Sequence, residues 1–477
     1  MCSGMRNSVR NGYRGAGKLD AKWMPFWGGW RESRAIYYAD SAATVCKILA
    51  VLVVPLGGSA THTLTLLGLA AWALLGPRRA IEALSLSWLA ISLNPGLYPI
   101  ATIADVLRWL VVGAAFISVC VYTFMRGLII PRAWIWMSVF VVVASVLSVV
   151  SSYAVDVSLF KLSSFFAAVT AVLLGFYHTR AEAARWMQWL FLMFALVVLV
   201  GLPLMGHPIG YFRNGRGFQG ILNHPQTYAV FLGPLLAWHV ARLLSREIRG
   251  SGMWVLAIAA GISLVATQSR TGVLAAGGGL VVAGVWWLLT NRARLKLRRS
   301  RAVVGLVVMC FATTVIVANM DDVAASTRRF VLKYEDVEDI SDAFYRSRGL
   351  LVERSLEGLR RRPWTGIGFG LPSDSSTLEI RSEPVFGLPV GASVEKGFAF
   401  VGLLEEVGVI GFTLFVVAIV VLLRPTLSRH SSYPSAALAA GAVLANFGEA
   451  VMFSLGGSGL FVWLLIGVAR VIAKRET

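Results

Sequence analysis

The chain has 477 residues, of which 57% are hydrophobic and only 14% are charged. A soluble protein of this size could not cover so much apolar surface, so the composition indicates a membrane protein. The formal net charge is +19, but the basic residues are spread over many short segments. That distribution favours contact with anionic lipid headgroups and argues against a nucleic-acid partner.

Apolar runs follow one another from Val45 to the end of the chain, and one long polar segment, residues 320–396, interrupts them. A spanning helix needs about 20 mostly apolar residues, and these runs are too long for barrel strands. We therefore predict an all-α polytopic membrane protein with about 12–14 transmembrane helices. The candidate spans are residues 45–58, 61–76, 80–94, 106–125, 133–150, 160–178, 186–204, 226–244, 253–268, 272–290, 302–319, 398–423, 434–455 and 458–473.

Lys and Arg gather in alternate connections between these spans, which are therefore predicted to be cytoplasmic. The opposite connections, predicted to face the periplasm or the outside, are residues 94–105, 151–160, 206–225, 269–271 and 320–396. Both termini come out cytoplasmic. The chain is predicted to begin with a basic cytoplasmic tail (residues 1–44) and a first membrane part (45–319). A large periplasmic loop (320–396), the last membrane helices (397–473) and a short cytoplasmic tail (474–477) follow.

The predicted outer loop 206–225 carries Arg213 and Arg216 among several glycines, against the positive-inside trend. Glycines let a backbone approach a ligand closely, and two guanidinium groups three residues apart suit a phosphate or diphosphate. The alternative is that both arginines reach lipid headgroups. His207 and His224 each precede a proline, and taken singly each is more typical of a structural residue than of a catalyst.

A third outer arginine, Arg270, stands in the turn Gln268–Gly272 between two apolar runs. An arginine at the mouth of a helical bundle usually has an anionic partner. That partner is either a ligand or one of the carboxylates predicted within the later spans, namely Glu405, Glu406 and Glu449.

The large loop contains a predicted helix that begins near Ser341 and ends before Pro363. Val352, Leu356 and Leu359 would share its apolar face and pack on the membrane domain. Alternating glycines in residues 363–370 then predict an irregular, close-packed turn, and residues 371–396 are expected to be irregular.

Four segments together resemble the bacterial O-antigen ligase and polysaccharide polymerase family. They are Arg213-Asn-Gly-Arg-Gly-Phe with Asn223-His-Pro-Gln-Thr-Tyr-Ala, then Gln268-Ser-Arg-Thr-Gly, Arg362-Pro-Trp-Thr-Gly-Ile-Gly-Phe-Gly, and Leu404-Glu-Glu-Val-Gly-Val-Ile-Gly. The resemblance implies an integral-membrane glycosyltransferase of the bacterial inner membrane. Such an enzyme takes a glycan from an undecaprenyl-diphosphate carrier at the periplasmic face, without a cofactor or a metal.

On this resemblance, Arg213, Arg216 and Arg270 would bind the diphosphate. The family's large-loop histidine, implied to activate the acceptor, has no counterpart, because residues 320–396 contain no histidine and Glu395-Lys396 stand in its place. A carboxylate can accept a hydroxyl proton if its pKa suits.

Glu395 is therefore the candidate catalytic base, and His224 is the alternative. The candidate supporting residues are Lys396, Glu405 and Glu449.

The missing histidine favours a polymerase of exopolysaccharide or O-antigen over a ligase that joins O-antigen to lipid A core. The expected partners are the lipid-linked glycan and the bilayer, with a flippase and a chain-length regulator as further candidates. A transporter of an anionic or lipid-linked substrate is the competing class, but it would show charges near the midplane and two similar halves. A non-catalytic scaffold of an envelope assembly is the third class.

Overall fold

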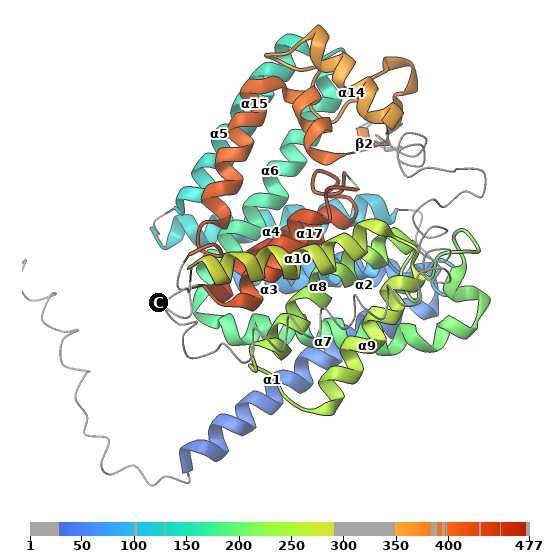
Figure 1. Ribbon diagram of the computed structural model, residues 1–477, viewed down its shortest axis with the longest axis vertical. Coiled ribbons are helices and arrows are strands. Elements are labelled where there is room, and N and C mark those ends of the chain that lie inside the picture. The colour runs from blue at the N-terminus through green and yellow to red at the C-terminus, as the bar shows by residue number, and fades with distance from the viewer. Residues whose placement is uncertain are drawn as a thin grey trace, which may run out of the picture. The chain divides into compact units, whose positions relative to one another are not determined.

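The computed structural model describes residues 28–99, 103–127, 130–290, 349–382, 389–393, 396, 398–428, 431–448 and 450–473. Within these ranges the chain is mainly helical (Figure 1). The helices are α1 (Gly28–Val53), α2 (Ser59–Ala73), α3 (Pro77–Ile91), α4 (Ala104–Met125), α5 (Arg132–Ser151), α6 (Val155–His178), α7 (Ala183–Gly201), α8 (Pro225–Leu244), α9 (Ser251–Ala266), α10 (Arg270–Thr290), α14 (Leu350–Arg361), α15 (Ala399–Leu423), α16 (Tyr433–Leu444) and α17 (Ser458–Ala473).

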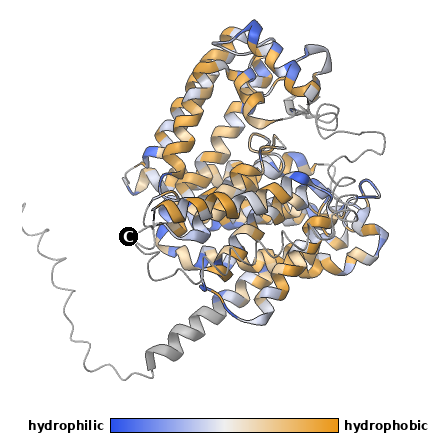
Figure 2. Cartoon of the chain, in the orientation of Figure 1, coloured by the Kyte–Doolittle hydropathy of each residue, from blue (hydrophilic) through white to orange (hydrophobic). Residues whose placement is uncertain are grey.

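Eight helical segments in the described ranges are long and apolar enough to cross a membrane, and three shorter apolar helices accompany them. Most residues along these helices are hydrophobic (Figure 2). Large apolar side chains such as Val142, Val146 and Val150 of α5 are exposed, as expected for a helix side that faces lipid. The fold is therefore that of an all-α polytopic membrane protein, as predicted. The predicted span 302–319 lies outside the described residues.

The chain divides into two units, residues 1–47 and 48–477, and α1 runs from the first into the second. In the second unit, one buried core joins α2, α3, α4, α6, α7, α8 and α17. Helix α3 is only 15 residues long and is buried on nearly all sides, which is typical of a helix surrounded by other helices. Helix α15 packs on α5, and α14 packs on α15.

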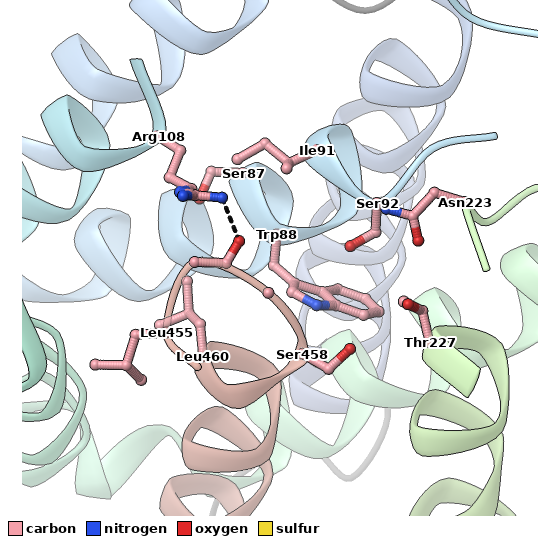
Figure 3. Close-up of a pocket in the computed structure, with 12 residues that line it drawn as sticks. Ser87, Trp88, Ile91, Ser92, Arg108, Asn223, Thr227, Leu455, Ser458 and Leu460 are labelled. Carbon is pink, nitrogen blue, oxygen red and sulfur yellow. Dashed lines mark hydrogen bonds between the residues drawn. The ribbon is translucent and has the colours of Figure 1, made fainter. Parts of the chain in front are cut away.

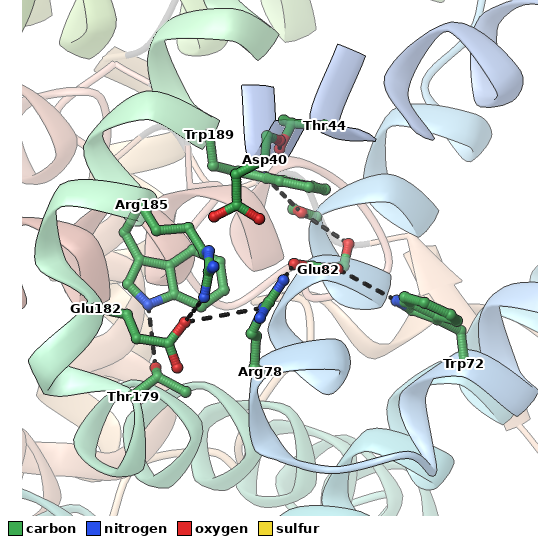
Figure 4. Close-up of polar contacts among 11 residues, drawn as sticks. Asp40, Thr44, Trp72, Arg78, Glu82, Thr179, Glu182, Arg185 and Trp189 are labelled. Atoms are coloured by element: carbon green, nitrogen blue, oxygen red, sulfur yellow. Dashed lines mark hydrogen bonds and ion pairs between the residues drawn. The ribbon is translucent and has the colours of Figure 1, made fainter. Parts of the chain in front are cut away.

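Two connections predicted to lie on the cytoplasmic side contact each other (Figure 4). Arg78 Nε lies 3.2 Å from Glu82 Oε1 and 3.8 Å from Glu182 Oε2, and Arg185 also pairs with Glu182. Trp72 Nε1 donates to Glu82 Oε2 at 3.3 Å. These contacts hold the start of α3 against the start of α7, so both basic connections lie at the same end of the helices.

Segments predicted to lie on the opposite side also contact one another. The Asn94 amide donates to the carbonyl oxygens of Ile209 and Gly220, at 2.8 and 3.0 Å. Tyr153 Oη donates to Pro372 O at 2.8 Å, which ties the α5–α6 connection to the large loop. Within the described residues, each of these contacts joins connections that the alternation of basic residues assigns to the same side. The membrane face assigned to these connections stays a prediction.

Three local expectations were wrong. The predicted span 434–455 is a 12-residue helix, because the chain turns at Asn446, whose Oδ1 accepts from Met452 N at 2.7 Å. Residues 371–396, expected to be irregular, contain an antiparallel pair, β1 (Glu379–Ser382) and β2 (Pro389–Ser393). Helix α14 ends before Pro363 and packs on α15 as predicted, but it does so through another face, since Leu356 is 40% exposed and the buried positions are Ser355 and Gly358. Its predicted start near Ser341 lies outside the described residues.

Candidate active site at the predicted outer end

The loop that carries Arg213 and Arg216 is folded by backbone hydrogen bonds to its own polar side chains. Arg213 N donates to Gln219 Oε1 at 2.7 Å, and Arg216 N and Gly217 N donate to Asn214 Oδ1 at 3.1 and 2.9 Å. Gln219 is fully buried, whereas the two arginines are exposed. A buried amide therefore fixes the loop, and both guanidinium groups remain accessible to a ligand.

The turn that carries Arg270 packs directly against this loop. Phe218 N donates to Ala266 O at 2.9 Å, and a Cβ on Gly217 would lie 2.8 Å from Thr267 O. Only a glycine permits this approach. The sequence expectation that the arginines gather at one end is therefore met at the level of the backbone segments that carry them.

Further contacts extend this end of the molecule to the start of α15. Gly448, in the connection between α16 and α17, lies so close to Thr271 that a Cβ would overlap its hydroxyl. Asn446 O in the same connection accepts from Ala399 N at 3.3 Å. A continuous series of contacts thus links the Arg270 turn with the chain segment that contains Lys396.

Lys396 and Glu405 form an ion pair that is almost fully buried, with Nζ and Oε2 2.5 Å apart and the side chains 4% and 0% exposed. Glu406 Oε2 instead accepts from Gly370 N at 2.8 Å. The alternative that these two carboxylates pair with the outer arginines is therefore wrong. A nearby lysine on the return segment pairs with Oε2 of Glu405, and the backbone of the large loop donates to Glu406.

His224 is the N-cap of α8, since its Nδ1 accepts from Gln226 N at 3.1 Å and Pro225 begins the helix. His207 caps the short 3₁₀ helix Pro208–Tyr211 in the same way. Both histidines therefore have a capping role through Nδ1, and the catalytic role considered for His224 stays a prediction. Glu395 and Glu449 lie outside the described residues.

The glycines of the third and fourth motifs have a structural explanation. Helix α15 is kinked at Gly408, where φ is +63°, so the Glu405 and Glu406 carbonyls are left to accept from Ile367 N and Gly368 N, both at 3.0 Å. A Cβ on Gly408 would lie 2.4 Å from Trp364 C. The expected close-packed turn is confirmed, and it docks into the kink of a membrane helix.

Sequence reasoning missed two cations that lie beside this region. Lys161 of α6 donates to Gly370 O, and Arg108 of α4 donates to Gly456 O. Arg108 stands about one turn and Lys161 roughly two turns inside its helix. Both lie next to a connection predicted to be outer and so break the positive-inside trend as Arg213 does. That signal could have identified both.

Tyr153 lies next to the buried carboxylates, outside the spans. Burial raises its pKa to about 12, and the negative charges of Glu405, Asp374 and Glu406 add to the effect. The phenol is therefore protonated at neutral pH and acts as a hydrogen-bond donor to Pro372 O. It fixes the large loop and is not a candidate base.

The described residues define a multi-pass helical membrane protein with an irregular, arginine-bearing end. Residues 255–416 match the family model of the O-antigen ligases. The matched segment is about a third of the 477 residues. It includes the Arg270 turn, the segment 362–370 and the kinked start of α15, but not the Arg213 loop.

This match confirms the resemblance to the O-antigen ligase family and supports a ligase- or polymerase-type function in a membrane. A comparison with curated proteins gave no match.

Proposed function

We propose that the protein is a glycosyltransferase that polymerises an exopolysaccharide or O-antigen from undecaprenyl-diphosphate-linked units at the periplasmic face of the bacterial inner membrane. The observation that carries the proposal is the pair of exposed arginines on a rigid loop, held against the Arg270 turn by the Phe218–Ala266 hydrogen bond. Guanidinium groups bind diphosphate oxygens in a bidentate manner. Their placement at one end suits a lipid carrier whose diphosphate lies at the membrane surface.

The proposed reaction is a displacement at the anomeric carbon of the lipid-linked glycan. An acceptor hydroxyl forms the new glycosidic bond, its proton passes to Glu395, and the bond to the carrier diphosphate breaks. Arg213, Arg216 and Arg270 stabilise the charge that develops on the leaving diphosphate, and such electrostatic stabilisation often dominates catalysis. Lys396 and Glu405 support this end of the protein as a buried pair.

The function is tested with purified protein in lipid nanodiscs, supplied with lipid-linked repeat units extracted from a strain that lacks the protein. We expect longer lipid-linked glycans to form and free undecaprenyl diphosphate to be released. Transfer to lipid A core without chain growth would identify a ligase. If neither product forms, glycosyl transfer is refuted. In cells, deletion should cause lipid-linked repeat units to accumulate.

The identity of the base is tested by two near-isosteric changes. Glu395→Gln keeps size and most hydrogen bonding but cannot accept a proton. We therefore expect the rate of transfer to fall by at least about 100-fold, as is usual for loss of a general base. His224→Asn removes the imidazole but keeps a good N-cap, so transfer should persist. The reverse pattern, measured as the rate of glycan transfer across pH, would assign the base to His224.

A further inference from the structure

A small pocket lies at the same end of the molecule, and Arg213, Arg216 and Arg270 are not among its lining residues. Figure 3 shows the residues that line it. The pocket is formed by the end of α3, the start of α4, the start of α8 and the segment that leads into α17. The space inside is about 380 Å³, counting the part open to solvent. Its polar lining residues include Ser87, Ser92, Arg108, Asn223, Thr227 and Ser458.

Three lining residues each have a buried polar atom with no hydrogen-bond partner in the described part of the chain. They are Trp88 Nε1, Arg108 Nε and Asn223 Oδ1. Trp88 is only 3% exposed. Buried polar groups in proteins are nearly always hydrogen-bonded, since leaving one unpaired costs free energy. Two unpaired donors and one unpaired acceptor around one pocket therefore point to an occupant, water or a ligand, that supplies both kinds of group.

The unpaired atoms are held in fixed positions. The Trp88 ring stacks on Phe461 with centroids 4.1 Å apart and on Phe231 at 5.6 Å. Asn223 N donates to Ser92 O at 2.7 Å, which fixes the end of the Arg213 loop against α3. Arg108 is anchored by Gly456 O and by Asp105, whose Oδ1 lies 3.1 Å away. A site with this rigidity is preorganised for binding.

The chemistry of the pocket disfavours an anion. The charge of Arg108 is already paired with Asp105 and with a carbonyl oxygen. The acceptor Asn223 Oδ1 would repel a phosphate oxygen. A hydroxyl group both donates and accepts, and the surrounding Ser92, Thr227 and Ser458 hydroxyls suit a ligand rich in such groups.

We propose that this pocket is a binding subsite for one sugar ring of the glycan, separate from the arginines that would hold the diphosphate. The inference rests on the proposed function for the identity of its ligand. The pocket also lies where the Asn223–Thr227 segment of the first motif meets α3, which gives that segment a role beyond capping α8.

The test is saturation-transfer NMR on the full-length protein in detergent, with methyl glycosides of hexoses, deoxyhexoses, N-acetylhexosamines and uronic acids as probes. We expect at least one class to bind. The signal should be lost in Asn223→Ala, which removes an unpaired acceptor, and in Ser458→Leu, which fills the pocket. It should persist in Gln226→Ala, an exposed neighbour that does not line the pocket, and in Arg213→Ala.

Absence of glycoside binding, or binding that persists in Ser458→Leu, would show that the pocket holds only water and would overturn the inference. Competition by inorganic pyrophosphate in Arg213→Ala protein would overturn the sugar class in favour of an anion. Circular dichroism and size-exclusion profiles verify that each variant is folded. If Ser458→Leu does not fold, the isosteric variant Thr227→Val takes its place.

Transfer kinetics separate this inference from the proposed function. Asn223→Ala should raise KM about tenfold with kcat little changed, since the lost hydrogen bond holds the sugar before and during reaction. A rise in KM for the lipid-linked donor alone, or for the acceptor alone, tells which glycan occupies the pocket. If Asn223→Ala is active and its KM is unchanged, only the sugar subsite is refuted. If glycosides bind but no transfer is detected, only the proposed glycosyltransferase function is refuted.

Discussion

Replacement of Arg213 or Arg216 by alanine is expected to reduce glycan transfer by about 100- to 1,000-fold, the range found when one group that stabilises transition-state charge is removed. Both side chains are exposed, and the backbone of the loop is held by Gln219 and Asn214. The protein should therefore keep its fold, and the loss should fall on the chemistry. The measurement is the rate of release of undecaprenyl diphosphate by purified variants in nanodiscs.

Lysine at either position should restore little activity, because a single ammonium group cannot make the paired hydrogen bonds of a guanidinium group. The matched control is Arg354→Ala, which removes an equally exposed arginine from α14 of the large loop. Full activity of both alanine variants would contradict the diphosphate role and show that these arginines contact lipid headgroups. An equal loss in Arg354→Ala would indicate that general positive charge matters and specific binding does not.

The sequence was sufficient for the fold class because spanning helices are encoded locally, in runs of apolar residues. It also assigned to the same side the connections that meet through the Arg78–Glu182 contact, and likewise those that meet through the Asn94–Gly220 contact. The lengths of short buried helices were harder to predict from the sequence. Residues 445–455 continue the apolar run that begins at residue 434 but include Asn446, and the chain turns there, where Asn446 Oδ1 accepts from Met452 N. Such a turn depends on one side chain and leaves little trace in hydropathy.

The site could be predicted only in part, because which charged side chains pair with each other depends on contacts between segments far apart in the sequence. The arginine loop and the Arg270 turn were identifiable from charges that break the positive-inside trend. The partner of Glu405 was not, since charge alone allows an arginine as well as Lys396. Trp88 became a candidate only from the structure, which shows that it lines a pocket between helix ends. A tryptophan within an apolar run is otherwise indistinguishable from a packing residue.

Replacement of Lys396 by methionine is expected to destabilise the protein by about 3–5 kcal/mol, because removal of one partner leaves an uncompensated charge in the interior. Glu405 is 0% exposed, and its Oε1 has no hydrogen-bond partner in the described part of the chain, so Lys396 provides its main compensation. The single variant Glu405→Leu should be similarly unstable. Unfolding of detergent-solubilised protein, followed by tryptophan fluorescence, measures the loss.

The double variant Lys396→Met with Glu405→Leu separates stability from catalysis. Replacement of a buried ion pair by apolar residues of similar size is often neutral or stabilising, so the double variant should recover most of the stability that either single change removes. If the pair only supports the return of the chain into α15, transfer should recover with it. If Lys396 also orients the substrate or Glu395, the double variant should be stable and inactive. Wild-type stability in Lys396→Met would contradict the buried pair itself, because Glu405 would then have to be neutral or otherwise satisfied.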